Sequence, residues 1–456
     1  MDKSNLILLL LILCVAAYHW GRTRALDLVA KGNQLHSLPT YYGYLVSLWC
    51  GLPALMILGV WSSLESFVIM SKVLASLPPE MVPQSADETS YLIAGIKNSA
   101  GSSQSESSEV ASAGALYLHL KIVSGWLLTA VVFSLAGLSS WFSAQKIVPS
   151  YRARNQVERA VTMILIASAT VAVFTTIGIV VSVLIESIRF FKIIPLTDFL
   201  FGLKWSPQVA IRSDQVGSTG AFGAVPLIAG TALISLVAMV VAVPVGLLSA
   251  IYLSEYASPR FRSIAKPLLE ILAGIPTVVY GFFAALVVAP FIRDFGALIG
   301  LEVSSESALA AGLVMGIMII PFVSSLSDDF INAVPQSLRD GAYALGATQS
   351  EAIRQVIMPA ALPGIVGGVL LAVSRAIGET MIVVMAAGLS ANLTANPLQA
   401  VTTVTTQIVT LLVGDQEFDS PKTLAAFALG LLLFLLTLGL NIFALHIVRK
   451  YREQYE

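Results

Sequence analysis

The chain has little charge and few cysteines for its length. Only 12% of its 456 residues are charged and 56% are hydrophobic, whereas a soluble domain carries roughly 25% charged residues. The formal net charge of -1 provides no basic excess, so nucleic acid is not an expected partner. Cys14 and Cys50 both lie in apolar runs, where a thiol behaves as a small hydrophobic group. The composition therefore indicates an all-α, polytopic integral membrane protein without a disulfide framework.

Motifs for nucleotide binding and metal binding are also missing. The sequence contains no Gly-Lys dipeptide and therefore no GxxxxGK[ST] phosphate-binding loop, so ATP binding by that means is excluded. The histidines show no spacing suited to metal ligands; they are His19, His36, His119 and His446. We expect a non-catalytic chain that binds no metal and no cofactor of its own.

Long apolar runs are what the sequence does contain. A spanning helix needs about 20 apolar residues, and nine runs qualify: 4–20, 42–70, 115–142, 160–186, 225–253, 268–291, 307–327, 362–387 and 423–447. The first resembles a signal peptide but lacks an Ala-x-Ala site, which favours an uncleaved helix. Lys and Arg are more numerous in the loops that follow the odd-numbered runs. This distribution predicts a periplasmic N-terminus and a cytoplasmic C-terminus.

The chain divides near residue 150. Residues 1–150 form an extension with three spans and a Ser-rich external loop, 76–114, which is predicted to be flexible. Residues 155–456 hold six spans with short internal loops. In that part, Glu270 could line an inner gate, but at the inner end of a span it is rather expected to snorkel or to pair with an Arg. Asp328 and Asp329 are expected to be solvated. A re-entrant or interfacial helix is predicted around four threonines, Thr402, Thr403, Thr405 and Thr406.

The internal loop 335–361 predicts two short helices. Pro335 suits a first helical turn, and Gly346 can end that helix. Thr348 and Glu351 form a capping box that starts a second helix, which Pro359 is expected to stop. Arg339, Asp340, Glu351 and Arg354 would form a polar face, and Ala342, Ala344, Leu345, Ile353 and Val356 an apolar one. Such a surface fits docking to another protein, and it equally fits an amphipathic loop on the lipid surface.

The apolar run after this loop carries two charges, Arg375 and Glu379, spaced to share one helical face. Each charge costs about 2.5–3.5 kcal/mol at the centre of a membrane helix, so a role is expected. The two could neutralise each other structurally or line a pathway. A guanidinium matches an oxyanion. Glu379 could accept a hydrogen bond from a protonated oxyanion, which would favour phosphate over sulfate, and Thr380 could add a hydroxyl.

The internal loop resembles the EAA motif of ABC importer permeases, which seats in an ATPase subunit. The spacing fits throughout at Asp340, Gly341, Ala342, Gly346, Val356, Met358 and Pro359. Asp340, Gly341, Val356 and Met358 depart from the consensus residues. The resemblance implies that the ATPase-coupling residues are Arg339, Asp340, Gly341, Ala342, Gly346, Glu351 and Pro359.

Residues 155–456 more specifically resemble PstC-type phosphate permeases. The resemblance rests on Ser374 to Met381, Ala386-Ala387-Gly388, Pro226 to Thr231, Tyr252 to Ala257, Leu272 to Gly281 and Pro335 to Thr348. It implies a six-helix, type I (MetI-like) permease core in a bacterial inner membrane, with Arg375, Glu379 and Thr380 in the substrate pathway. The implied partners are a PstA-type sister permease, two PstB-type ATPase subunits that bind ATP and Mg²⁺, and a PstS-type phosphate-binding protein. A phosphate-signalling regulator is a further candidate.

The sequence leaves three other functions open. One is an ABC permease for sulfate, molybdate or another oxyanion. A second is a proton- or sodium-coupled secondary transporter with Glu379 as the coupling carboxylate. The docking loop and the lack of inverted repeats count against it. A third is a membrane sensor that reports phosphate.

Overall fold

The computed structural model describes residues 3–77, 86–99, 108–209, 219–413 and 420–452. Within these ranges, nine helices are long and apolar enough to span a membrane: Lys3–Ala30, Pro39–Ala75, Ser112–Gln145, Ala153–Ile193, Val225–Tyr256, Thr277–Leu298, Ala308–Asn332, Gln349–Ile377 and Pro421–Lys450. The predicted all-α, multi-pass architecture with nine spans is therefore confirmed. By internal contacts the chain forms two compact units, Met1–Phe174 and Thr175–Glu456.

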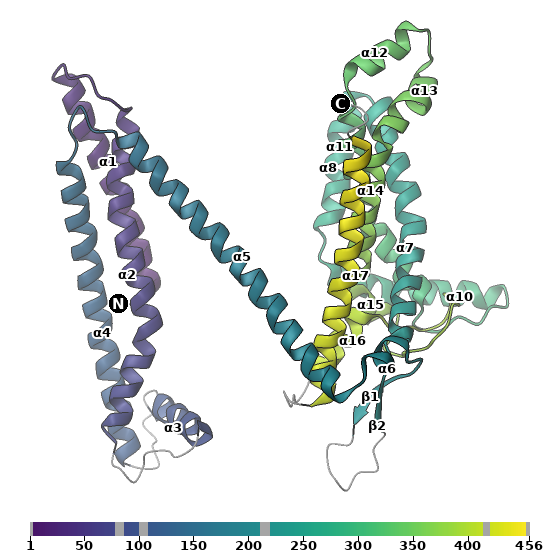
Figure 1. Cartoon of the computed structure of the whole chain (residues 1–456), viewed down its shortest axis with the longest axis horizontal. Coiled ribbons are helices and arrows are strands. Elements are labelled where there is room, and N and C mark those ends of the chain that lie inside the picture. Colours follow the sequence, from purple (N-terminus) through teal and green to yellow (C-terminus); the bar gives the residue numbers. More distant parts are fainter. Residues whose placement is uncertain (1–2, 78–85, 100–107, 210–218, 414–419, 453–456) are drawn as a thin grey trace. The chain divides into compact units, whose positions relative to one another are not determined.

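The first unit is built from three long helices, α1 (Lys3–Ala30), α2 (Pro39–Ala75) and α4 (Ser108–Gln145) (Figure 1). Their shared core includes Tyr42, Val46, Leu128 and Val132, all nearly inaccessible to solvent. The Tyr42 hydroxyl donates a hydrogen bond of 2.8 Å to the carbonyl of Tyr151. This bond ties the start of α2 to the segment that leads into α5 (Ala153–Ile193).

Two described parts of the loop 76–114, which the sequence predicts to be flexible, are helical. Helix α3 (Ala86–Ser99) lies inside the predicted flexible loop, and α4 already begins at Ser108. The side chain of Ile96 is fully buried against Ile69 and Val73, so apolar side chains give this segment a packing surface that its serine content conceals. Four serines of that prediction lie outside the described residues: Ser102, Ser103, Ser105 and Ser107.

The second unit is arranged around α11 (Ala308–Asn332). In the most apolar window of α11, 61% of the residues are buried, compared with at most 33% in any other span. Its core residues include Met315, Ile319 and Val323. It packs against α7 (Val225–Ile251), which continues as the π-helical turn η2 (Tyr252–Tyr256), and against α14 (Met358–Ile377). Helix α17 (Pro421–Arg452) packs in turn against α14.

The sixth predicted span, 268–291, is wrong in its boundaries. The predicted range begins within a separate helix, α8 (Pro259–Gly274). The observed span begins after α8 and runs through α9 (Thr277–Phe283), η3 (Ala284–Val288) and α10 (Ala289–Leu298). The helices break at Ile275 and Pro276, both of which have extended backbone angles. A residue that precedes proline is disfavoured in the helical conformation, which explains the break.

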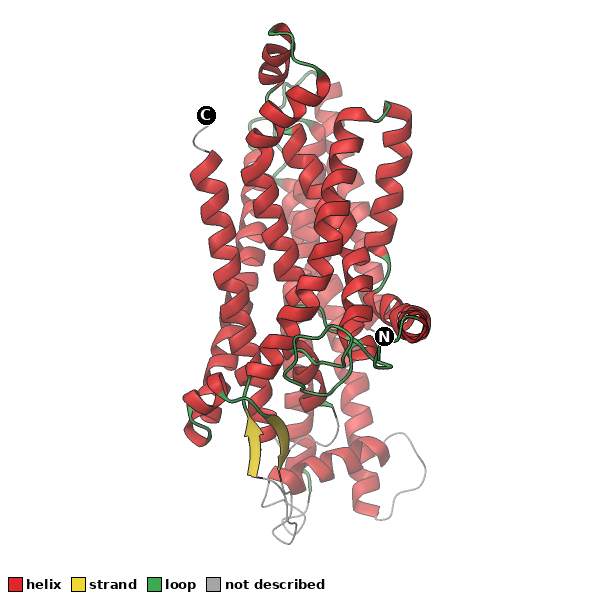
Figure 2. Ribbon diagram, turned by 90° about the vertical axis from the view of Figure 1, so that its right-hand side faces the viewer, coloured by secondary structure: helices red, strands yellow, loops and turns green. Residues whose placement is uncertain are grey.

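Short elements close one end of this unit. These are α6 (Leu196–Phe201), the antiparallel pair β1 (Trp205–Val209) and β2 (Thr219–Phe222), and α16 (Val404–Leu412), all labelled in Figure 1. The two strands are the yellow arrows of Figure 2. The sequence did not predict the hairpin. Aromatic rings join the hairpin to its neighbours edge to face: Phe190 of α5 contacts Phe199 of α6 and Phe222 of β2, and Phe222 contacts Trp205 of β1. The helices of the internal loop, α12 (Gln336–Ala344) and α13 (Gln349–Ala352), lie at the opposite end of the unit (Figure 1).

Candidate functional site

The internal loop folds as predicted at its turn. Helix α12 (Gln336–Ala344) is followed by Gly346, whose φ of 86° is a left-handed conformation that glycine adopts without a steric penalty. The Ala347 amide then donates 3.1 Å to the carbonyl of Ala342. The capping box at the start of α13 (Gln349–Ala352) is confirmed: the Glu351 carboxylate accepts from the Thr348 amide at 2.8 Å, and the Thr348 hydroxyl accepts from the Glu351 amide.

Pro359 does not stop the second helix, contrary to prediction. Residues Gln349–Ile377 form one continuous span in which α13 passes through the π-helical turn η4 (Ile353–Ile357) into α14. Proline removes an i→i−4 hydrogen bond and its ring crowds the preceding turn. A π-turn lengthens the hydrogen-bonded loop by one residue and relieves that conflict. The second coupling helix is therefore continuous with the membrane span that carries Arg375.

Arg339 was predicted to belong to an exposed polar face, but it points into the protein. Its guanidinium donates to the Glu255 carboxylate of η2 at 2.5 Å and to the Ile331 carbonyl of α11 at 2.6 Å. The two charged side chains are only 13% and 7% exposed. The Gln349 amide also donates to the Glu255 carbonyl, at 2.6 Å. Arg339 and Glu255 therefore attach α12 and α13 to the ends of two spans.

The solvent-exposed surface of the internal loop combines apolar and polar side chains. Leu345 is 91% exposed and Tyr343 is 44% exposed. Asp340 is exposed and accepts a hydrogen bond from Gln336 at 3.0 Å. Gly341, Glu351 and Pro359 are exposed too, whereas Ala342 and Ile353 are buried. A large leucine at the tip of a rigid turn is a surface that another protein can cover.

Asp328 was predicted to be solvated, and this is wrong. Its side chain is 5% exposed and accepts two hydrogen bonds from Arg262, at 2.9 and 3.0 Å, and one from Lys266, at 2.8 Å. The Asn332 amide adds a contact of 3.0 Å. The hydrogen bond to Asp328 raises the pKa of Lys266 above its ordinary value. Its neighbour Asp329 is exposed, as predicted.

These contacts join four elements into one network. Asp328 and Asn332 of α11 hold Arg262 and Lys266 of α8, and the Ser254 hydroxyl of η2 donates to Asn332 at 3.3 Å. The next residue, Glu255, holds Arg339 of α12. Glu270, further along α8, is exposed, and no ion pair to it is found among the described residues, so it does not complete this network.

Arg375 and Glu379 do not share a helical face. Helix α14 ends at Ile377, and a new helix, α15 (Met381–Ala386), begins after a break. The Glu379 carboxylate accepts hydrogen bonds from the first amides of α15, those of Met381 at 3.0 Å and Ile382 at 3.4 Å. A carboxylate satisfies such free N–H groups at a helix start. Glu379 is therefore fixed to the break.

Arg375 lies on the surface of this chain. Its side chain is exposed, and its guanidinium carbon lies 5.5 Å from the centre of the Phe322 ring, within the range of a cation–π contact. No ion pair to Arg375 is found in the part of the chain that the structure describes. Thr380 is partly buried, and its hydroxyl lies 3.4 Å from the Gly378 carbonyl.

The predicted threonine-rich helix supports this break. It is α16, and the Thr403 side chain caps its first turn. The Thr405 hydroxyl donates to the Glu379 carbonyl at 2.8 Å, and the Val404 amide donates to the Thr231 hydroxyl of α7 at 3.1 Å. Broken backbone at membrane depth is tolerated where protein covers it or where it lines a cavity, and transporters bind ions at such breaks. Thr405 is thus a site residue whose role the sequence did not specify.

Two family models match the chain. Residues 7–175 match a family described as a phosphate ATP-binding cassette transporter, and residues 242–453 match the binding-protein-dependent transport system inner membrane component. The chain is 31% identical over 296 residues to a Bacillus subtilis protein named "probable ABC transporter permease protein", covering 64% of this chain and 92% of that one. The chain belongs to the ABC transporter permeases.

Other relatives are named phosphate permeases. The Haemophilus influenzae phosphate transport system permease protein PstC is 37% identical over 153 residues, which cover 30% of this chain and 49% of the relative. The match thus spans about half the length of that relative. A solved bacterial ABC transporter that imports alginate aligns with a TM-score of 0.44 at 14% identity, over 66% of this chain and 99% of the other. As a permease of this family, the chain works with ATPase and substrate-binding partners.

Proposed function

We propose that this chain is a permease subunit of an ATP-driven importer of inorganic phosphate. The observation that carries the proposal is an exposed Arg375 beside a broken membrane helix. An uncompensated guanidinium at membrane depth is costly, and it recognises an oxyanion through a planar fork of N–H donors. The relatives named PstC and the N-terminal match to a phosphate transporter family support phosphate among oxyanions.

Glu379 contributes in a different way from a counter-ion. One of its carboxylate oxygens, Oε1, caps α15. The other oxygen has no hydrogen bond among the described residues. Such an oxygen would accept a hydrogen bond from a protonated phosphate and repel a fully ionised sulfate. The site would discriminate between the two anions in this way. Thr380 and Thr405 would hold the backbone of the break while the anion passes Arg375.

The working assembly in this proposal has four further parts. A PstA-type sister permease covers the surface that carries Arg375. Two PstB-type ATPase subunits supply ATP and Mg²⁺ chemistry, and a PstS-type protein delivers phosphate from outside. The chain lies in a bacterial inner membrane with its N-terminus periplasmic and its C-terminus cytoplasmic, and it carries no cofactor of its own. A phosphate-signalling regulator is a candidate additional partner.

Coupling would pass through the internal loop. The ATPase would bind the exposed surface of the loop around Tyr343 and Leu345. A displacement of α12 would move Glu255 through its ion pair with Arg339. Because α13 continues through η4 into α14, the same displacement would also reach the helix that carries Arg375.

Uptake of labelled phosphate tests the proposal. Cells that lack this chain are complemented with the wild type, with Arg375→Gln, or with Arg293→Gln as the matched control. Arg293 is an exposed arginine that pairs with its neighbour Asp294. We expect wild type and Arg293→Gln to restore uptake, Arg375→Gln to lower it at least tenfold, and excess sulfate to leave it unchanged.

Four other results would contradict the proposal. Full uptake with Arg375→Gln would remove Arg375 from the pathway. Complete competition by sulfate, or no restoration by the wild type, would refute the phosphate assignment. Uptake that survives loss of the ATPase subunit would favour a secondary transporter instead.

A further inference from the structure

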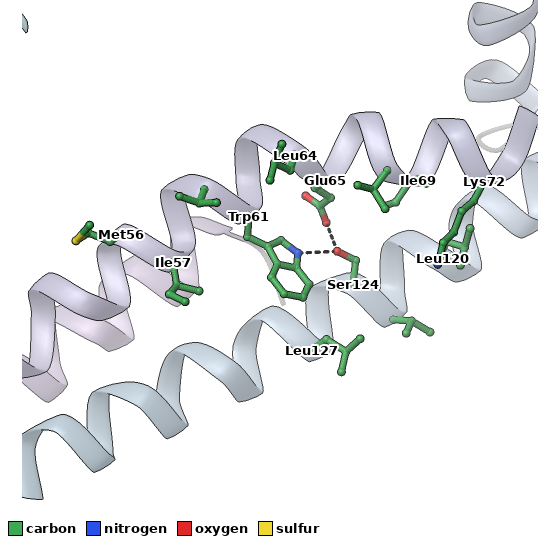
Figure 3. Close-up of a pocket in the computed structure, with 13 residues that line it drawn as sticks. Met56, Ile57, Trp61, Leu64, Glu65, Ile69, Lys72, Leu120, Ser124 and Leu127 are labelled. Atoms are coloured by element: carbon green, nitrogen blue, oxygen red, sulfur yellow. Dashed lines mark hydrogen bonds between the residues drawn. The ribbon is translucent and has the colours of Figure 1, made fainter.

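The N-terminal unit carries an apolar groove between α2 and α4 with a volume of about 610 Å³ (Figure 3). Its walls include Met56, Val60, Leu64, Leu120, Val123 and Leu127. These side chains are not covered by the rest of the chain: Met56 is 70% exposed and Val60 is 60% exposed. The groove lies within the first unit and is far along the chain from Arg375, so it is no part of the site described above.

A charge-neutral polar cluster forms one wall of the groove. The Glu65 carboxylate accepts from Lys3 at 2.7 Å and from the Ser124 hydroxyl at 2.7 Å. The Trp61 ring nitrogen donates to the same hydroxyl at 3.0 Å, as Figure 3 shows. The Glu65 side chain is only 11% exposed. Because Lys3 neutralises it, this carboxylate presents little negative charge to a ligand in the groove.

Unpaired positive charge lies at one end of the groove. Lys72 lines that end, beside Leu120 in Figure 3. Lys121 of α4 lies three residues before Ser124, one helical turn along the same helix, and its ammonium lies 5.8 Å from the centre of the Tyr117 ring. Neither lysine has an ion pair among the residues described. The groove region therefore holds more positive than negative charge: Lys3 pairs with Glu65, and Lys72 and Lys121 remain without a counter-charge in the described part of the chain.

The position of these lysines fits the edge of a bilayer. Lys72 lies just beyond the apolar run 42–70, and the end of a spanning apolar run is where the headgroup region is expected to begin. The stretch of α2 from Met56 to Lys72 is about 24 Å long at 1.5 Å per residue. One leaflet contributes about half of a hydrocarbon core of about 30 Å, and its headgroups extend further. Long lysine side chains reach the headgroup layer from slightly deeper positions.

We propose that this groove binds one anionic phospholipid. An acyl chain lies along the apolar walls between α2 and α4, and the negatively charged headgroup sits at Lys72 and Lys121. Charge complementarity selects an anionic headgroup over a zwitterionic one. Lipid binding in this groove does not depend on which substrate the transporter imports, so this proposal and the phosphate assignment can fail separately.

The test uses the purified transporter with all its subunits in nanodiscs of phosphatidylglycerol or of phosphatidylethanolamine. Native mass spectrometry counts the lipids retained after the nanodisc is removed. We expect the wild type to retain phosphatidylglycerol at least threefold more than phosphatidylethanolamine. The double variant Lys72→Gln, Lys121→Gln should lose that preference, and Lys97→Gln, an exposed lysine of α3, should keep it.

A second variant separates the groove from the headgroup contacts. Val60→Trp fills the apolar part and should lower retention of both lipids. Equal retention of the two lipids by the wild type would overturn the proposal, as would an unchanged preference in the double variant. Cross-linking of a cysteine at position 60 to another subunit, without retained lipid, would instead assign the groove to a partner helix.

Discussion

Asp328 and Asp329 are adjacent acidic residues that the structure separates sharply. Asp328 is buried between Arg262 and Lys266, and Asp329 is exposed. We predict that Asp328→Asn destabilises the transporter and impairs uptake, whereas Asp329→Asn, its matched control, changes neither. The two substitutions remove the same charge one residue apart, so only the environment distinguishes them.

The expected size follows from the burial of the partners. Removing one member of a fully buried ion pair costs about 3–5 kcal/mol, because the other charge is left without a partner. Here the Arg262 and Lys266 side chains are 31% and 34% exposed, so both can hydrate once Asp328 is gone. Asparagine also keeps one acceptor oxygen. We therefore expect a loss of about 2–3 kcal/mol in the free energy of unfolding.

The assay is thermal unfolding of the purified transporter, together with phosphate uptake and ATP hydrolysis. We expect the unfolding midpoint of Asp328→Asn to fall by several degrees. Uptake should fall more than ATP hydrolysis, because α8 would be released from α11 while the ATPase contact remains. Asp328→Glu, which keeps the charge, should recover part of the loss. Equal midpoints for Asp328→Asn and Asp329→Asn would refute the reasoning.

Three further predictions concern the internal loop and the ion pairs of Asp328. Gly346→Ala should lower the unfolding midpoint, because alanine in the left-handed backbone conformation of Gly346 is strained by about 1–2 kcal/mol. Gly341→Ala, at a helical position with open space around it, should be neutral or slightly stabilising. Equal effects of the two substitutions would contradict this reasoning. Leu345→Ser should reduce the amount of ATPase that copurifies without lowering the midpoint of the permease, whereas Arg339→Met should lower the midpoint, because only Arg339 is bound internally. The pKa of Lys266 is raised in the folded protein, so the stability that Lys266 contributes is complete below its ordinary pKa of 10.5 and is lost as pH rises through the folded value. The difference in unfolding midpoint between wild type and Lys266→Met should therefore stay constant from about pH 6 to 9 and shrink above about pH 10.5. A decrease of that difference at lower pH would contradict the prediction.

The charged membrane segment shows where sequence reasoning was limited. The spacing of Arg375 and Glu379 matches a helical face, and periodicity alone carries no sign of a break. Two contacts stabilise the break: the Thr405 hydroxyl of α16 donates to the Glu379 carbonyl, and the Glu379 carboxylate accepts from the first amides of α15. Local propensity could not reveal the Thr405 contact, because it comes from a separate helix.

The sequence by itself determined the class of protein, the number of spans and the turn at Gly346. Apolar run length, scarcity of charge and capping chemistry are local properties, so each is legible along the chain. Only the tertiary structure decided that Asp328 is buried while Asp329 is not, that Arg339 points inward, and that Lys3 neutralises Glu65. Those outcomes depend on which helices pack together, because a charge is buried only where another element supplies its partner.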